Sequence, residues 1–517
     1  MTTNTLEIRA GRREWLGLAS LAMPTLLLSV DTSVLYLALP HLSSDLSASS
    51  TQQLWIMDIY GFMIAGFLIT MGTLGDRIGR RKLLLIGAAA FGSASVLAAF
   101  STTAGLLIAA RALMGIAGAT LMPSTLALIS NMFLNPKQRA TAISLWMSCF
   151  LVGMIIGPLI GGIMLEKFWW GSVFLLGVPV MLVLLGFGPF VLPEYKNERA
   201  GKLDLLDVFL SLAAILPFIY GFTEIAREGW KASSITSIMV GIVVGIVFVH
   251  RQLRLEHPLL DLKLFSNHAF SATLTTMLFT AVMMGAMGFF ITQYLQTVVG
   301  LTPLKAGLWM IPQSLSMILG TMLAPMLTRR IQPVYVIAGG LLITVIGMVL
   351  ISVASGTNGC MLVIVGFVLD TLGIAPTVVL GTDLVIGSAP PEKAGSAASL
   401  SETSNQLGIA LGVALLGSVA SIVYRSRLVD IFAGETRGAA GGTQRLAGEA
   451  QKLTGEARES IIGALAAAEK LPGKQGGYLI ASAREAFMAG IHVVALIAAV
   501  VFALLAVLAF VALRKKK

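Results

Sequence analysis

Five charged residues interrupt long apolar runs of this sequence, and their types are those that move protons or contact cations. They are Asp31, Asp58, Arg111, Asp370 and Glu402. If the runs cross a membrane, each charge is costly unless it faces water or an opposite charge. Carboxylates placed in this way commonly belong to proton relays or ion pathways. We therefore treat these five residues as the candidate site for proton coupling and substrate contact.

Three of the five charges are predicted to share one depth. Asp31 lies nine residues before Pro40, Asp58 about five residues into its apolar run, and Arg111 about seven residues from one end of its run. At 1.5 Å per helical residue, all three lie roughly 7–14 Å below one membrane surface. We therefore predict one charged layer in which Arg111 lies beside a carboxylate, because this arrangement reduces the cost of all three charges. In a second interpretation Asp58 only reaches the membrane surface.

The other two candidates lie in the second half of the chain. Asp370 is about ten residues into its apolar run and Glu402 about eight, which places both near the middle of the membrane. Asp383 and Glu224 lie closer to the ends of their runs, where an interfacial position is favoured. The 24 methionines and the aromatic residues either line an adaptable apolar pocket or serve ordinary packing.

Composition excludes a water-soluble protein. Of the 517 residues 56% are apolar and 12% charged, against roughly 25% charged residues in an ordinary soluble domain. The two cysteines and five histidines show no metal-ligand spacing, so neither a metal site nor a disulfide framework is predicted. No phosphate-binding loop of the G-x-x-x-x-G-K-[ST] type occurs, which argues against an ATP-driven pump. We expect neither an enzyme nor a bound cofactor.

The elements that must position these charges are membrane helices. A hydrocarbon core about 30 Å thick needs roughly 20 apolar residues, and the sequence offers fourteen such runs joined, except for the last connection, by short loops. We predict spans near 15–39, 53–74, 83–101, 104–130, 140–164, 171–192, 205–224, 234–250, 270–291, 305–327, 333–354, 360–387, 394–422 and 486–513.

The net charge of +10 is explained by topology. With the N-terminus inside, basic clusters such as 77–82 and 514–517 fall on the inner side, and few basic residues are left for the short outer loops. The positive-inside rule then places both termini in the cytoplasm and the chain in the cytoplasmic membrane. Nucleic-acid binding is therefore not expected. The polar segment 425–485 is predicted to lie outside, as an amphipathic helical hairpin or as a partly ordered spacer.

Two motifs are candidates for conformational change. The loop after the second span, Gly72-Thr-Leu-Gly-Asp-Arg-Ile-Gly-Arg-Arg-Lys82, combines small residues that allow a tight turn with an acid that can cap a helix. The fifth span carries a glycine stripe with a proline, which either packs a neighbouring helix or permits a bend. The candidate residues of the two motifs are Gly72, Asp76, Arg77, Gly79, Arg80, Gly153, Gly157, Pro158 and Gly161.

These motifs together resemble those of the major facilitator superfamily, in particular its fourteen-helix drug:proton antiporters of the quaternary-ammonium exporter type. The resemblance covers nearly the whole chain. Further segments that match this branch are Ser29 to Pro40, Gln52 to Tyr60, Arg111 with Gly115, Glu256 to Phe265, Gln293 to Gln296, and Lys393 to Gly395 with Glu402.

The resemblance implies an all-α polytopic fold of two six-helix bundles with two inserted helices. The corresponding domains are 1–200, 201–255 and 256–517. It also implies transport by alternating access. Buried carboxylates without a nucleotide-binding loop favour export of lipophilic, mainly cationic drugs such as quaternary ammonium compounds, driven by the proton gradient and conferring drug resistance. We expect a monomer. The tenth span lacks the carboxylate that some exporters of dications carry, so monovalent cations are the expected substrates.

Two other functions are compatible with parts of the sequence. A facilitator of the same fold for a neutral or anionic metabolite is the main alternative, although such a site normally needs inward basic or hydroxyl-rich groups and only Arg111 qualifies. A membrane sensor or scaffold without transport leaves charges on several helices unexplained. Energised efflux of a cationic dye distinguishes the three.

Overall fold

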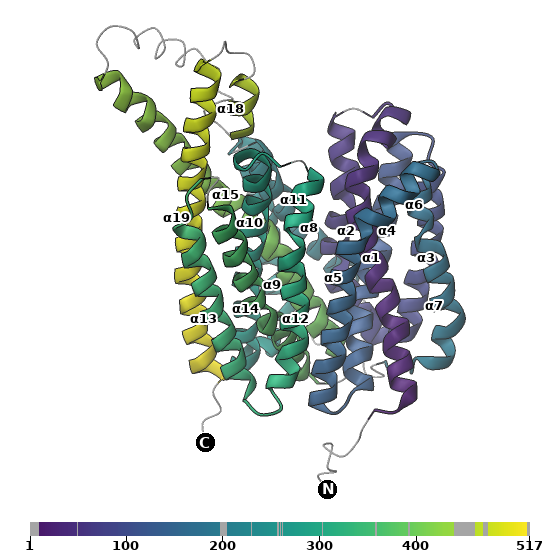
Figure 1. Cartoon of the computed structure of the whole chain (residues 1–517). Helices are drawn as coiled ribbons and strands as arrows, with labels where there is room; N and C mark the ends of the chain where they lie inside the picture. The colour runs from purple at the N-terminus through teal and green to yellow at the C-terminus, as the bar shows by residue number, and fades with distance from the viewer. Residues whose placement is uncertain are drawn as a thin grey trace.

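Long helices make up almost all of the computed structural model (Figure 1). Among the described residues, fourteen segments are long and apolar enough to cross a membrane, which confirms the predicted number of spans. Three of these segments join two consecutive helices. The described residues are 10–48, 50–196, 204–228, 230–255, 258, 260, 262–301, 303–356, 359–390, 393–438, 461–468 and 474–513.

The helices form two bundles and a hairpin. The first bundle comprises α1 (Arg12–Asp45), α2 (Ser50–Ile78), α3 (Arg80–Ala99), α4 (Ala104–Met132), α5 (Pro136–Lys167), α6 (Ser172–Leu175) and α7 (Gly177–Val191). The hairpin is α8 (Leu205–Glu228) with α9 (Ala232–Gln252). The second bundle comprises η1 (Leu262–Ser266), α10 (His268–Gln293), η2 (Tyr294–Val298), α11 (Pro303–Trp309), α12 (Ile311–Leu327), α13 (Pro333–Ser352), α14 (Cys360–Gly387), α15 (Ala394–Gly438), α18 (Ile461–Ala468) and α19 (Lys474–Leu513).

Helix α1 begins and α19 ends at the same face of the molecule, the lower face in Figure 1. We call it the terminal face, and the face that carries α18 the far face. Each bundle has its own apolar core. The bundles meet where α2 packs on α15 and α5 on α12, and α8 packs on both α2 and α15. The hairpin therefore lies across one seam between the bundles. The domain boundaries at 200 and 255 stay a prediction.

Local capping fixes where the helices of the site begin. The Thr103 hydroxyl accepts a hydrogen bond from the Leu106 N–H and starts α4. The Asn135 side chain accepts from the N–H groups of Lys137 and Gln138 and starts α5, with Pro136 in the first turn. These caps satisfy backbone donors that the helix leaves unpaired. They set the depth of every residue on α4 and α5.

The last two spans differ from the prediction at their far-face ends. The thirteenth span, expected to end at 422, is part of α15, which has 45 residues and ends at Gly438. Helix α19 begins at Lys474 instead of near 486. A helix of 45 residues is about 68 Å long, far more than a membrane core requires. The apolar count stopped at the membrane surface, whereas alanine, leucine and arginine continue the helix beyond it. Within the predicted hairpin, 439–460 and 469–473 lie outside the described residues.

The glycine stripe of α5 packs against α1. A Cβ on Gly153 meets the Leu26 carbonyl oxygen at 2.5 Å, and a Cβ on Gly161 meets Val34 Cγ1 at 2.7 Å. A Cβ on Gly157 overlaps the Ser33 hydroxyl. The stripe thus holds α1, the helix of Asp31, close to α5 within one bundle, as small residues do at membrane helix interfaces.

Gly157→Ala is expected to lower the thermal stability of the purified protein. The added methyl group meets Ser33 and the backbone of α1, and overpacking of this kind costs about 1–3 kcal/mol. Gly162→Ala is the matched control, because a Cβ there meets nothing within 4 Å. Unfolding curves of the two variants in detergent give the comparison. Equal melting temperatures contradict the packing role of the stripe.

Candidate functional site

Asp31 and Arg111 form a buried ion pair in the first bundle. Arg111 Nη1 lies 2.6 Å from Asp31 Oδ2, and the two side chains are 1% and 7% exposed. The guanidinium also lies 4.4 Å from the centre of the Tyr60 ring, and its Nε donates to the Ile56 carbonyl at 3.4 Å. A buried arginine that keeps its charge needs such partners. Arg111 thereby joins α1, α2 and α4.

The charged layer lies in the far-face half of the bundle. Counted along their helices at 1.5 Å per residue, Asp31, Asp58 and Arg111 lie about 28–32 Å from the terminal-face ends of α1, α2 and α4. Asp58 is half-buried two residues before Tyr60 on α2. The three residues thus share a depth, and Asp31 and Arg111 are in contact.

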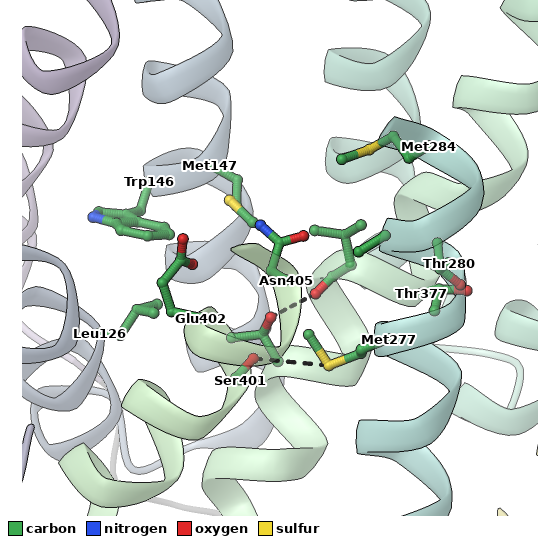
Figure 2. Close-up of a pocket in the computed structure, with 13 residues that line it drawn as sticks. Leu126, Trp146, Met147, Met277, Thr280, Met284, Thr377, Ser401, Glu402 and Asn405 are labelled. Atoms are coloured by element: carbon green, nitrogen blue, oxygen red, sulfur yellow. Dashed lines mark hydrogen bonds between the residues drawn. The ribbon is translucent and has the colours of Figure 1, made fainter. Parts of the chain in front are cut away.

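A pocket lies between the two bundles, and Glu402 is its one carboxylate (Figure 2). Leu126, Trp146 and Met147 line it from the first bundle. The second bundle contributes, besides Glu402, the residues Met277, Thr280, Ala281, Met284, Thr377, Val378, Thr382, Ser401 and Asn405. A methionine-rich lining with one aromatic ring adapts to apolar ligands of different shapes.

The Glu402 carboxylate is held by its own helix and lies beside Trp146 in Figure 2. Gln406 Nε2 donates to Glu402 Oε1 at 2.9 Å, one turn further along α15. The pocket offers space for water of about 30 Å³, whereas drug-sized ligands occupy sites of roughly 300–1,000 Å³. The pocket is therefore smaller in this structure than a site that holds a drug-sized ligand.

The pocket and the charged layer lie at different depths. Leu126, Trp146 and Glu402 are about 9–15 Å from the terminal-face ends of their helices. The layer of Asp31 and Arg111 is roughly 20 Å further from that face by the same count. Glu402 of the second bundle therefore lies nearer the terminal face, and Asp31 of the first bundle lies nearer the far face.

Asp370 does not line the pocket, although Glu402 and Asp370 were both placed near the middle of the membrane. It is 1% exposed, and neither carboxylate oxygen has a hydrogen-bond partner among the described residues. Its backbone oxygen accepts from the Thr344 hydroxyl of α13. By helix count Asp370 lies about 13 Å further from the terminal face than Glu402. The structure does not bring these two carboxylates into one site.

The motif predicted as a loop lies mostly in helices, since α2 continues to Ile78 and α3 begins at Arg80. We keep the name loop motif for Gly72 to Lys82, which joins the two bundles at the terminal face. Asp76 Oδ2 accepts hydrogen bonds from the Ser396 N–H at 3.1 Å and the Ser396 hydroxyl at 2.9 Å, and so caps the first turn of α15. Arg80 pairs with Asp76, and its Nη1 donates to the Gly72 carbonyl at 2.9 Å. The backbone of Gly79 has φ of 114°, a left-handed conformation that favours glycine.

Two contacts at this face were not predicted from the sequence. Glu194 accepts from the backbone N–H groups of Arg81 and Lys82 and caps α3. Asp383, expected only at the membrane surface, pairs with Arg139 across the two bundles. A comparison of charged residues by depth could have suggested this pair, because Arg139 and Asp383 lie near the terminal-face ends of α5 and α14.

Several polar contacts between the two bundles lie towards the terminal face. They include Asp76 with Ser396, Arg139 with Asp383, and Ser144 and Ser148 with Thr321. These contacts join the two bundles on the terminal-face side of the protein. We call the Arg139–Asp383 pair the bundle bridge.

Breaking the bundle bridge is expected to open the pocket towards the terminal face. A charge-assisted hydrogen bond contributes about 1.5–3 kcal/mol, so Arg139→Gln should raise the open population about tenfold or more. The measurement is the labelling rate of Met147→Cys by a membrane-impermeant thiol reagent, with Cys149 and Cys360 replaced by Ser. Asp383→Asn should raise the labelling rate in the same way, and the double variant should raise it little further. Arg329→Gln, at an exposed position, is the control. Unchanged labelling in both single variants contradicts the role of the bridge.

Fourteen helices that are long and apolar enough to cross a membrane, in two bundles with a pocket between them, define a multi-pass membrane protein. The family model of the Major Facilitator Superfamily matches residues 21–413. The chain belongs to this superfamily, which confirms the family predicted from its motifs.

Several curated relatives match nearly the whole chain. The multidrug efflux pump LfrA of Mycolicibacterium smegmatis is 39% identical over 98% of both chains. The methyl viologen resistance protein SmvA of Salmonella typhimurium is 32% identical, over 92% of this chain and 93% of that protein. The tetracenomycin C resistance and export protein of Streptomyces glaucescens is 30% identical, over 92% of this chain and 88% of that protein.

Two solved structures share the fold. The human organic anion transporter TETRAN superposes with a TM-score of 0.55 at 15% identity, over 94% of this chain and 98% of that one. A bacterial homologue of the human lysosomal transporter Spinster gives a TM-score of 0.54 at 17% identity, over 98% and 100%. At these identities the likeness concerns the fold alone.

Proposed function

We propose that this protein exports lipophilic, mainly monovalent cations in exchange for protons, across the cytoplasmic membrane and with the terminal face inside. The observation that carries the proposal is Glu402, a single carboxylate in a methionine-lined pocket between the two bundles. A cation with apolar substituents suits such a pocket, because the lining contacts the substituents and the carboxylate neutralises the charge. The relatives named for multidrug efflux and drug resistance support export of this kind.

The exchange uses the two depths of the site. A cation enters from the terminal face when the bundle bridge opens, and it displaces a proton from Glu402. Asp31 and Asp58, in the layer nearer the far face, take up protons from that side. In this proposal Asp31 gives up its ion pair with Arg111 when it takes up a proton. Asp370 is a second buried carboxylate that can carry a proton.

The number of protons exchanged for each cation decides whether the membrane potential helps to drive the exchange. One charge that crosses the membrane gains or loses about 2.3 kcal/mol per 100 mV. A monovalent cation exchanged for one proton moves no net charge, so only the pH gradient drives it. Exchange for two protons uses the potential as well.

Efflux of ethidium from preloaded cells tests the proposed function. Cells that make the protein should lose the dye faster than cells that do not, and an uncoupler should abolish the difference. Efflux that persists with the uncoupler contradicts proton coupling, and no efflux of any lipophilic cation favours a facilitator for neutral or anionic metabolites. Full substrate-induced proton release by both Asp31→Asn and Asp58→Asn in proteoliposomes removes these two residues from the proton pathway.

A further inference from the structure

A groove lies on the α8–α9 hairpin, apart from the pocket that Glu402 lines. Its apolar part is formed by Leu206, Leu210, Ile246 and Val247. The side chains of Leu206 and Ile246 are 50% and 64% exposed. The groove offers a volume of about 630 Å³, which lies within the roughly 300–1,000 Å³ of sites that bind small molecules.

The polar end of the groove is basic and lies at the terminal face. His250, Arg251 and Arg254 line it, at and just after the end of α9. Ile246 is four residues before His250, so the lining changes from apolar to basic within about one helical turn. This order matches a membrane leaflet, in which the acyl chains lie inward of the charged headgroups.

The three basic residues differ in what they already contact. Arg251 donates to Asp207 at 2.7 Å and to Asp204 at 2.5 Å, which fixes its position at the base of the hairpin. A hydrogen bond from the Leu206 N–H, together with Arg251, lowers the pKa of Asp204, so this partner stays ionised at neutral pH. Arg254 is exposed and forms no ion pair with any acidic residue that the structure describes. Its exposed side chain lines the polar end of the groove.

We propose that this groove binds a phospholipid with an anionic headgroup from the leaflet at the terminal face. Arg254 and His250 contact the headgroup, and an acyl chain lies along Leu206, Leu210 and Ile246. Complementary charge selects the anionic headgroup, because each basic residue near a membrane surface contributes about 1 kcal/mol of attraction to acidic lipids. The site does not depend on which substrate the protein transports.

A lipid in this groove contacts an element that connects the two bundles. Helix α8 packs on α2 and on α15. Asp207, held by Arg251, also acts electrostatically on Arg77 of the loop motif. Occupancy of the groove is therefore expected to stabilise the folded protein as well as the hairpin.

Lipid binding to the purified full-length protein tests the proposal. The probes are dioleoyl phosphatidylglycerol, which is anionic, and dioleoyl phosphatidylcholine, which is zwitterionic, each titrated in detergent and followed by native mass spectrometry of the first bound lipid. Arg254→Gln is expected to weaken phosphatidylglycerol binding about fivefold and to leave phosphatidylcholine binding unchanged. Arg330→Gln removes an exposed charge on the same face in another loop and serves as its control.

A second variant separates the groove from general attraction to basic charge. Ile246→Trp fills the groove and keeps every charge, and it is expected to weaken binding of both lipids. Ile346→Trp, at an exposed position of α13, is its control. The proposal is wrong if Arg254→Gln binds phosphatidylglycerol as tightly as Arg330→Gln, or if Ile246→Trp binds lipid as tightly as Ile346→Trp.

Discussion

Replacing Glu402 by Gln should lower the export of monovalent lipophilic cations by at least about thirtyfold. The pocket is small, and Glu402 is the one carboxylate among its lining residues. Loss of one partner of a desolvated charge pair costs about 2 kcal/mol or more, which is about a thirtyfold change. Gln has nearly the shape of Glu and can still accept from Gln406, so the fold should be retained. Initial rates of tetraphenylphosphonium transport in proteoliposomes give the measurement.

Two controls make this prediction specific to charge. Glu402→Asp keeps the carboxylate and should retain part of the cation transport. Glu166→Gln removes an exposed carboxylate at the end of α5 and should change nothing. Transport of a neutral lipophilic compound, if the protein accepts one, should be much less sensitive to Glu402→Gln. Cation transport by Glu402→Gln at the wild-type rate removes Glu402 from the site.

Replacing Arg111 by Gln should destabilise the protein by about 3–5 kcal/mol, because it leaves Asp31 buried without its partner. This is a large part of the 5–15 kcal/mol typical of a folded domain. Thermal unfolding in detergent is the measurement, and surface variant Arg329→Gln should lie within about 0.5 kcal/mol of wild type. A stability equal to wild type contradicts the burial of an ionised pair.

The double variant Asp31→Asn with Arg111→Gln distinguishes stability from function. It has no unpaired charge, so it should recover much of the stability that Arg111→Gln alone loses. It also lacks a carboxylate that can carry a proton, so its cation transport should remain low. If the double variant transports like wild type, the ion pair is structural and takes no part in coupling.

Most of the architecture was predictable because each span must satisfy the same physical condition. A membrane helix needs a long apolar run, and that condition can be counted from the sequence. The free-energy cost of a charge within a membrane likewise identified Asp31 and Arg111, which form one ion pair in the structure. The predicted far-face ends of the last two spans were wrong, because α15 and α19 continue as helices where the apolar run has stopped.

The rest of the site depends on contacts between segments far apart in the chain. Arg139 and Asp383 are 244 residues apart, and no local pattern records their pairing. The pocket lining has the same origin, since Trp146 and Met277 are ordinary residues of apolar helices until the two bundles meet. The depth of Asp370 predicted a functional carboxylate. Depth alone could not predict which residues surround Asp370 or that it lies outside the pocket. Which helix faces meet is decided by packing.

The exchange of a cation for protons is tested most directly by measuring both movements in the same proteoliposomes. With a pH-sensitive dye inside, adding tetraphenylphosphonium outside should drive protons out as the cation enters, at a fixed ratio. Collapse of the pH gradient should slow uptake that the gradient drives, and Glu402→Gln should show neither movement. Cation uptake at an unchanged rate with no accompanying proton movement would contradict the proposed mechanism.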